Sequence, residues 1–289
     1  MKLTDPLVSV DWLASHLDRP QLRIFDTTVH MQHKPGGGYL TESGYEDWRK
    51  AHIPGAGFLD LAGEFSDPDS EIPFTMPSPE RFCQLAAEHG VSDDSAVLLY
   101  SHGSVMWATR AWWMFRSVGF DNVAVLDGGW QAWSGGNRPV SSGLDAYPCG
   151  QLHPKPQPHL WADREEMQAN QQGKGVCTLN ALAPTVYSGE DNRYGRPGHI
   201  PGSYNVFNGD LLDPESGRFL ERDAIREKFK ASGALTAERV VVYCGGGISA
   251  TVDALALLLL GHGNVAVYDG SMSEWVRDED LPLTLGSEP

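Results

Sequence analysis

Residues 240–250 read Val-Val-Val-Tyr-Cys-Gly-Gly-Gly-Ile-Ser-Ala. The β-branched run predicts a buried parallel strand that ends at Cys244. Three glycines follow, and they let the backbone curl until several N–H groups point at one spot, which suits an anion. A helix predicted over 249–260 brings the positive end of its dipole to the sulfur, and both effects favour a thiolate. A buried structural cysteine before a flexible turn would show the same pattern, so the rest of the chain must decide.

Length, charge and cysteine usage limit the class of protein. The chain has 289 residues, which predicts two domains, and it contains no apolar run long enough for a membrane span. Residues 1–20 lack the basic-then-apolar plan of a signal peptide. The formal charge of −16 argues against nucleic acid or an anionic membrane as a partner. The four cysteines show neither CxxC spacing nor a disulfide framework, so we expect a cytoplasmic protein.

The first half of the chain alternates short apolar strands with helices. Strands are predicted over 22–27, 96–100 and 123–126, and helices over 79–89 and 105–118. The second half then repeats three landmarks of the first half in the same order. The repeated pairs are 52–56 with 199–203, 98–101 with 241–244, and 123–129 with 265–271. This tandem duplication predicts two α/β domains, each a mostly parallel sheet with helices on both faces.

The two copies differ at the place where the chemistry is expected. Ser101 stands in the first copy where Cys244 stands in the second, and no Gly-x-Ser-x-Gly elbow surrounds it. We therefore expect residues 1–140 to form an inactive domain and residues 159–289 to form the catalytic one. Residues 141–158 are rich in Pro and Gly and are predicted to be a stiff linker.

Several motifs together resemble the two-domain rhodanese family of thiosulfate and 3-mercaptopyruvate sulfurtransferases, over nearly the whole chain. They are the His-Ile-Pro-Gly boxes at 52–55 and 199–202, Arg-Ala-Trp-Trp-Met at 110–114, and Tyr-Asp-Gly-Ser-Met-Ser-Glu-Trp at 268–275. The resemblance implies an inactive first domain, a catalytic second domain and an active site between them. It also implies that the histidines of the two boxes fix turns.

The glycine loop bears on the sulfur donor. Thiosulfate-preferring members resemble Cys-Arg-Lys-Gly-Val-Thr-Ala, whereas mercaptopyruvate-preferring members resemble the neutral Cys-Gly-Ser-Gly-Val-Thr-Ala. The loop of this chain is neutral and follows the second pattern at Gly245 and Gly247. We expect Gly245, Gly246, Gly247, Ile248 and Ser249 to bind substrate. The Ser249 hydroxyl could equally cap the helix or contact the sulfur.

The donor's carboxylate needs a cation. The family places substrate arginines where this chain has Leu182 and Val186, so we predict that Arg193 and Arg196 bind the carboxylate instead. The alternative for both arginines is a surface loop in which they pair with Glu190 or Asp191.

The resemblance implies nucleophilic catalysis through Cys244. The thiolate takes the outer sulfur of 3-mercaptopyruvate, a small-molecule donor, and passes it from a persulfide to thioredoxin, a low-molecular-weight thiol or cyanide. No cofactor and no metal are expected. Two alternatives stay open, namely a thiosulfate:cyanide sulfurtransferase and a non-catalytic sulfur carrier or partner-docking module. Cysteine phosphatase chemistry is disfavoured, because such enzymes need an arginine at the position of Ala250.

Overall fold

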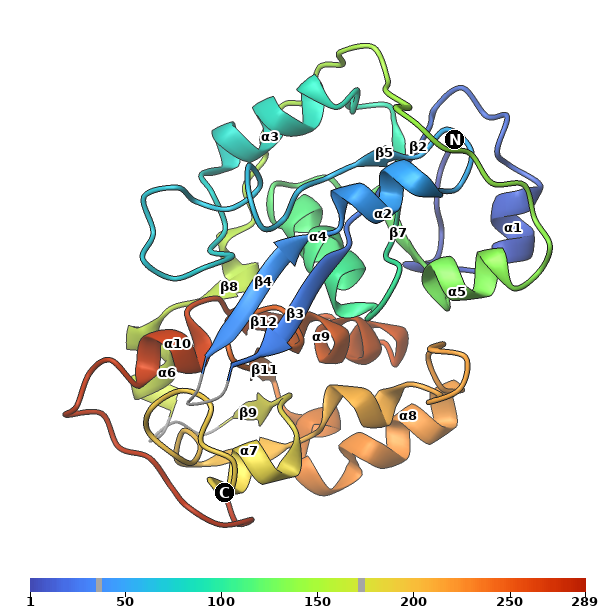
Figure 1. Ribbon diagram of the computed structural model, residues 1–289. Coiled ribbons are helices and arrows are strands. Elements are labelled where there is room, and N and C mark those ends of the chain that lie inside the picture. Colours follow the sequence, from blue (N-terminus) through green and yellow to red (C-terminus); the bar gives the residue numbers. More distant parts are fainter. Residues whose placement is uncertain (35–37, 171–174) are drawn as a thin grey trace.

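The computed structural model describes residues 1–34, 38–170 and 175–289, and it contains two parallel five-stranded sheets (Figure 1). In the first sheet the strand order is β1-β7-β6-β2-β5, and in the second it is β10-β9-β11-β12-β8. Read from the opposite edge, the first order matches the second strand by strand, which confirms the duplication. The first sheet consists of β1 (Leu7–Val8), β2 (Leu22–Asp26), β5 (Gly57–Phe58), β6 (Ala96–Tyr100) and β7 (Val123–Leu126). The second consists of β8 (Trp161–Ala162), β9 (Val176–Asn180), β10 (Ser203–Asn205), β11 (Arg239–Tyr243) and β12 (Val265–Tyr268).

Helices cover both sheets. In the first domain they are α1 (Val10–Ala14), α2 (Tyr45–Lys50), α3 (Pro79–Glu88), α4 (Met106–Ser117) and α5 (Gly129–Ser134). In the second they are α6 (Arg164–Asn170), α7 (Pro184–Ser188), α8 (Arg222–Phe229), α9 (Ala250–Leu259) and α10 (Ser271–Trp275). Short 3₁₀ turns lie at Pro158–Leu160, Asn208–Leu211, Lys230–Ser232 and Ala234–Thr236. Within the described ranges, no helix is long and apolar enough to cross a membrane.

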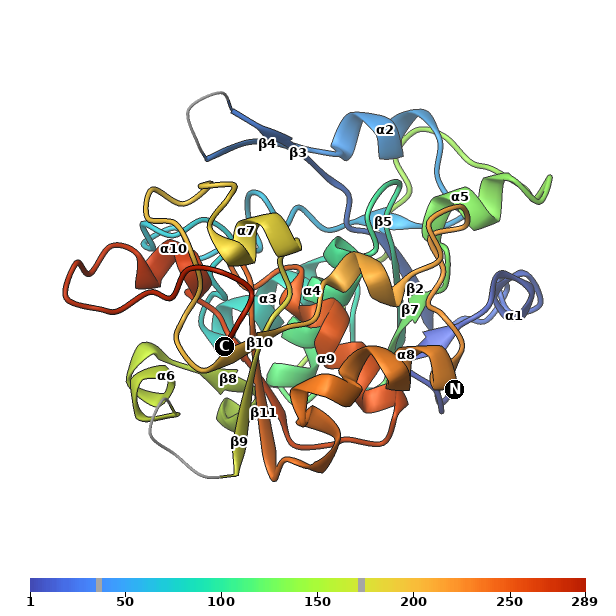
Figure 2. The same cartoon turned by 90° about the horizontal axis from the view of Figure 1, so that it is seen from below.

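The two domains meet along α4 and α9, which lie next to each other in the middle of the molecule (Figures 1 and 2). Both helices are buried over most of their length because each packs on its own sheet and on the other helix. The hydroxyl groups of Thr109 and Thr251 form a buried hydrogen bond of 2.7 Å across this contact. One continuous hydrophobic cluster contains residues of both domains. The interface is therefore part of the core.

An antiparallel hairpin leaves the first domain and reaches the second (Figure 1). It consists of β3 (Val29–His33) and β4 (Tyr39–Ser43), and the sequence analysis did not predict it. The Gly38 amide donates to the Arg193 carbonyl of the second domain at 3.1 Å. This contact fixes the far end of the hairpin over the second domain.

The linker follows the surface of the first domain. Ser141 pairs with His52 in an isolated antiparallel bridge. Further along, the Tyr147 hydroxyl accepts the Ile24 amide at 3.0 Å, and the Lys155 amide donates to the Val118 carbonyl at 2.8 Å. Because β2 and α4 anchor the linker in this way, the second domain starts from a fixed point.

Candidate active site

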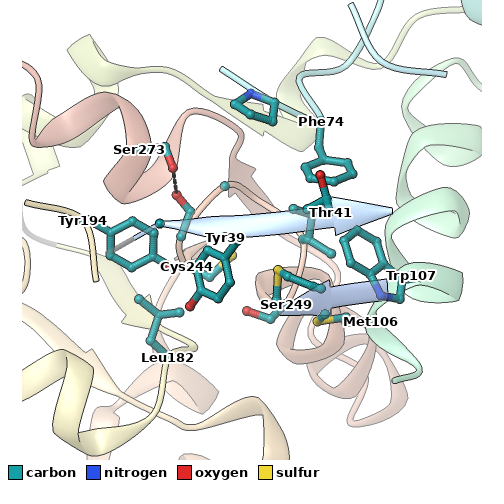
Figure 3. A pocket seen from close by; sticks show the side chains of 16 residues that line it. Tyr39, Thr41, Phe74, Met106, Trp107, Leu182, Tyr194, Cys244, Ser249 and Ser273 are labelled. Carbon is teal, nitrogen blue, oxygen red and sulfur yellow. Dashed lines mark hydrogen bonds between the residues drawn. The ribbon is translucent and has the colours of Figure 1, made fainter. Parts of the chain in front are cut away.

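Cys244 directly follows β11 and lies at the base of a cavity of about 270 Å³ (Figure 3). Only 2% of the residue is exposed. The strand ends here and α9 begins at Ala250, as the sequence predicts, so residues 245–249 form the tight loop between them. The carboxyl end of a central parallel strand is the usual place for a site in such a sheet.

Ser271 holds this loop in shape. Its Oγ accepts the amides of Cys244 at 3.1 Å and Gly247 at 3.0 Å, and it donates to the Tyr268 carbonyl at 2.7 Å. The backbone of Ser271 has a φ of +50°, a left-handed value that costs a non-glycine residue free energy. The corresponding residue of the first domain, Gly129, has a φ of +51°. The second domain thus keeps a strained serine where the first has glycine, and its hydroxyl organises the cysteine loop.

The remaining loop amides are available to an anion. Within the described residues, the amides of Gly245, Gly246, Ile248 and Ser249 donate to no protein group. The Gly247 amide is already bonded to Ser271, and its φ of +71° requires glycine, so its role is to shape the loop. The Ser249 side chain makes no capping bond with α9 and lines the cavity. The structure thus shows no capping bond from this hydroxyl, and its contact with the sulfur stays a prediction.

A buried arginine of the first domain contacts the cysteine loop. Arg110 is 1% exposed, and its guanidinium pairs with Asp269 at 2.6 Å. It also donates to the carbonyls of Gly247 at 3.1 Å and Phe74 at 2.6 Å. The other Asp269 oxygen accepts the Met76 amide at 2.9 Å. The first domain thereby supplies part of the support for the cysteine loop.

Two tyrosines that sequence reasoning missed, Tyr39 and Tyr194, line the cavity. A Cβ added to Gly245 would lie 1.9 Å from the Tyr194 hydroxyl, so this hydroxyl touches the loop only because residue 245 is glycine. Burial raises the pKa of Tyr194 well above its ordinary value, which keeps its proton on oxygen. Tyr39, from the hairpin, places its ring 6.3 Å from that of Tyr194. No sequence signal links these residues to Cys244.

The two predicted arginines lie on the segment around Tyr194 but outside the lining of the cavity. The Nε and Nη2 atoms of Arg193 each lie 2.7 Å from the Asp191 carboxylate, and Nη1 donates to the Tyr39 hydroxyl at 3.2 Å. Arg196 donates to the carbonyls of Asp278 at 2.8 Å and Leu281 at 2.7 Å. Arg193 therefore reaches the cavity through Tyr39, whereas Arg196 binds the C-terminal segment.

The equivalent place in the first domain lacks this organisation. The Ser101 hydroxyl donates to the nearby Ser104 carbonyl at 2.7 Å. His102 stacks on Trp130 with ring centres 4.5 Å apart. The histidines of the two His-Ile-Pro-Gly boxes are fully buried, with Nδ1 of His52 on the Trp48 carbonyl and Nδ1 of His199 on the Tyr187 carbonyl. These contacts are structural.

The other three cysteines lie elsewhere, and all four are free. Burial raises the pKa of both Cys83 and Cys177 to about 11, so these two remain thiols at neutral pH. Cys149 is exposed in the linker. Within the described residues, no group of three or more His, Cys, Asp or Glu side chains is placed to hold a metal ion.

Comparison with known proteins shows the family. The model of the rhodanese-like domain matches residues 9–135 and 188–278. The 3-mercaptopyruvate sulfurtransferase of Escherichia coli K12 is 31% identical over 96% of both chains. The thiosulfate/3-mercaptopyruvate sulfurtransferase 2 of Arabidopsis thaliana is 31% identical over 96% of this chain and 86% of its own. The crystal structure of the Escherichia coli 3-mercaptopyruvate sulfotransferase SseA superposes with a TM-score of 0.81 at 30% identity, over 93% of this chain and 99% of that one.

These matches define a protein with two tandem rhodanese domains, as the duplicated sheets and the single cysteine loop indicate. The chain belongs to the rhodanese family, and it is a sulfurtransferase.

Proposed function

We propose that this enzyme takes sulfur from 3-mercaptopyruvate, holds it as a persulfide on Cys244 and passes it to a thiol or to cyanide. The observation that carries the proposal is the placement of Cys244 among free loop amides, at the base of a cavity whose 16 lining residues include no charged side chain. The free thiols of all four cysteines fit the cytoplasmic compartment that we propose for it.

Sulfur transfer proceeds in two displacements. In the first, the Cys244 thiolate attacks the thiol sulfur of mercaptopyruvate, an S–S bond forms, and the C–S bond breaks with its electrons on carbon. That carbanion, an enolate, takes the proton of the substrate thiol and leaves as pyruvate. In the second, an acceptor thiolate attacks the outer sulfur and restores the Cys244 thiolate. The amides of Gly245, Gly246 and Ile248 stabilise the negative charge on sulfur in both resting states.

The charge of the donor decides between the two donors of the family. Mercaptopyruvate carries one carboxylate and so brings a single negative charge into the cavity. Thiosulfate carries two charges, and a second buried charge without a partner costs several kcal/mol. The neutral cavity therefore favours mercaptopyruvate.

Which residues bind the donor's carboxylate stays a prediction. We predicted Arg193 and Arg196, and neither has yet been tested. Their contacts support a division in which Arg193 positions the Tyr39 hydroxyl at the cavity and Arg196 holds the C-terminal segment.

Steady-state kinetics with both donors test the proposal. We expect kcat/KM to be at least tenfold higher with 3-mercaptopyruvate than with thiosulfate, and pyruvate to appear in step with the sulfur transferred. Equal values, or a preference for thiosulfate, would contradict the choice of donor. Absence of turnover with both donors would favour the carrier role instead.

A further inference from the structure

Two phenol side chains from different domains lie near each other in the cavity above Cys244 (Figure 3). Tyr39 belongs to the hairpin strand β4, Tyr194 belongs to the segment before the second His-Ile-Pro-Gly box, and their ring centres are 6.3 Å apart. The Tyr194 hydroxyl lies against Gly245, which directly follows the cysteine. Only a short chain of atoms separates the carboxylate of mercaptopyruvate from its sulfur, so a donor whose sulfur is at Cys244 brings its carboxylate to this part of the cavity.

Both hydroxyl groups have a proton to donate. The Tyr39 oxygen accepts Nη1 of Arg193 at 3.2 Å, and a hydroxyl that accepts at oxygen still keeps its own proton. Burial raises the pKa of Tyr194 well above its ordinary value, so this phenol also keeps its proton. Tyr187 provides a contrast, because its hydroxyl already donates to the Ser203 carbonyl at 2.6 Å. Among the described residues, neither Tyr39 nor Tyr194 donates to a carbonyl or a carboxylate in this way.

The ion pair behind Tyr39 favours a negative group on this side of the cavity. Asp191 binds Nε and Nη2 of Arg193, each at 2.7 Å, whereas Nη1 faces the Tyr39 hydroxyl. The positive end of the pair therefore points at the phenol oxygen, and the hydrogen bond received there makes the phenol proton a stronger donor. The Gly38 amide donates to the Arg193 carbonyl at 3.1 Å, which fixes the hairpin at the same residue. Arg193 thus acts on the cavity through Tyr39, although it is not part of the lining.

We propose that the hydroxyl groups of Tyr39 and Tyr194 bind the carboxylate of the sulfur donor. The inference rests on the proposed function, since it takes 3-mercaptopyruvate as the donor. Each phenol donates its proton to a carboxylate oxygen, and Arg193 is a positioning residue that holds Tyr39 in place. These two hydrogen bonds to an ionised group offset part of the hydration that the carboxylate loses on entry.

Donors with and without a carboxylate test this inference. Mercaptoacetone has the thiol and the ketone of 3-mercaptopyruvate but a methyl group in place of the carboxylate, so sulfur transfer from it leaves acetone. We would measure kcat and KM with both donors for the parent, Tyr39→Phe, Tyr194→Phe and the double variant. Tyr204→Phe is the matched control, because it removes the hydroxyl of an exposed tyrosine that does not line the cavity. If mercaptoacetone is not turned over, its constant as a competitive inhibitor of 3-mercaptopyruvate replaces kcat/KM.

We expect each single variant to lose about tenfold or more in kcat/KM with 3-mercaptopyruvate, mainly through a higher KM, and to stay within about twofold of the parent with mercaptoacetone. The double variant should lose more than either single variant, and Tyr204→Phe should match the parent with both donors.

Three results would overturn this inference while the proposed function stands. They are an unchanged kcat/KM with 3-mercaptopyruvate in both single variants, an equal loss with both donors, which would place the hydroxyls on the ketone or the sulfur, and an equal loss in Tyr204→Phe. A parent enzyme that takes no sulfur from 3-mercaptopyruvate would overturn the proposed function itself. The two failures are therefore distinguishable.

A cation placed in the wall provides a second test. Leu182 lines the cavity and is half-buried. In the double variant Tyr39→Phe with Tyr194→Phe, Leu182→Arg supplies a new partner for a carboxylate, and Leu182→Met keeps the wall apolar. We expect the arginine to raise kcat/KM with 3-mercaptopyruvate relative to mercaptoacetone by about fivefold or more, and the methionine to leave this ratio within about twofold. An unchanged ratio in a folded Leu182→Arg enzyme that still forms the Cys244 persulfide contradicts a carboxylate site at this wall.

Discussion

Ser271 combines an unfavourable backbone conformation with three hydrogen bonds that organise the cysteine loop. A left-handed residue with a Cβ costs roughly 1–2 kcal/mol relative to glycine. That cost persists because the hydroxyl pairs two buried amides that would otherwise have no partner. Strain at this position is therefore linked to the geometry of the Cys244 loop.

Two substitutions of Ser271 distinguish the cost of its backbone strain from the contribution of its hydrogen bonds. Ser271→Ala keeps the strain and leaves two buried amides unpaired, which costs about 1–3 kcal/mol for each group. Ser271→Gly loses the same bonds but relieves the strain, so its free energy of unfolding in urea is expected to exceed that of the alanine variant by roughly 1 kcal/mol. Both variants should lose kcat/KM by tenfold or more. A Ser271→Ala variant as stable as the parent would contradict this role.

Asp253 is a fully buried acid in α9, and within the described residues neither of its carboxylate oxygens has a hydrogen-bond partner. Burial raises its pKa well above the ordinary value. A raised folded-state pKa means that the unfolded chain releases this proton first. Stability is therefore lost as pH rises above the unfolded value of about 4 towards the raised folded value.

The neutral variant Asp253→Asn tests that pH dependence. We expect the difference in free energy of unfolding between Asp253→Asn and the parent to move in favour of the variant as pH rises, by up to about 1.4 kcal/mol per pH unit. Urea unfolding at pH 5 and pH 8 measures it. A difference that does not change between the two pH values would show that the carboxyl group is not held in its protonated form.

The elements differ in how far the sequence could predict them. Strands β6 and β7 and helix α9 were predicted within a residue because each is an apolar run between clear end signals. The hairpin β3–β4 was missed because most of its residues are exposed or half-buried and its far end contacts the other domain. Its contribution to the site depends on tertiary structure, which local pattern does not encode.

The residues of the candidate site also differ in how far the sequence could predict them. Cys244 and its glycine loop could be predicted because the strand, the loop and the helix are contiguous in sequence. Tyr194 could not, since its position depends on the missing side chain of Gly245 in a distant segment. The motif at 110–114 was recognised as similar to a family motif, but the bond of Arg110 to the Gly247 carbonyl required the structure.

The segment that carries Arg193 and Arg196 gives a prediction for this element. Arg193→Ala frees the Tyr39 hydroxyl, and we expect kcat/KM with mercaptopyruvate to fall about three- to tenfold, or roughly 0.7–1.4 kcal/mol. Arg196→Ala removes two bonds to carbonyls, so its main effect should be a loss of about 2 kcal/mol in the free energy of unfolding. Kinetics and urea unfolding of both variants distinguish the roles. A hundredfold kinetic loss in either would instead support direct binding of the carboxylate.

At the scale of the whole molecule, the first domain, which has Ser101 in place of Cys244, helps to build the site of the second domain. It contributes the hairpin, part of the cavity wall and the buried pair of Arg110 with Asp269. The pair connects α4 to the segment after β12, so the arrangement of the two domains and the shape of the cysteine loop depend on one another.

Removal of one partner of this pair should be costly. Arg110→Met leaves the Asp269 carboxylate without its cation, and we expect a loss of about 3–5 kcal/mol in the free energy of unfolding and a large drop in turnover. The double variant Arg110→Met with Asp269→Leu removes both charges and should recover part of the stability. A double variant with the sum of the two single losses would contradict coupling between these residues.

Mass spectrometry after donor addition tests the central claim most directly, namely that Cys244 alone carries the sulfur. The enzyme is treated with 3-mercaptopyruvate without acceptor, and the intact protein and its peptides are weighed. We predict one added sulfur atom, confined to the peptide that contains Cys244, and no persulfide and no turnover in Cys244→Ser. The peptides of Cys83, Cys149 and Cys177 serve as internal controls and should stay unmodified. Sulfur on one of those peptides, or turnover in Cys244→Ser, would contradict the account.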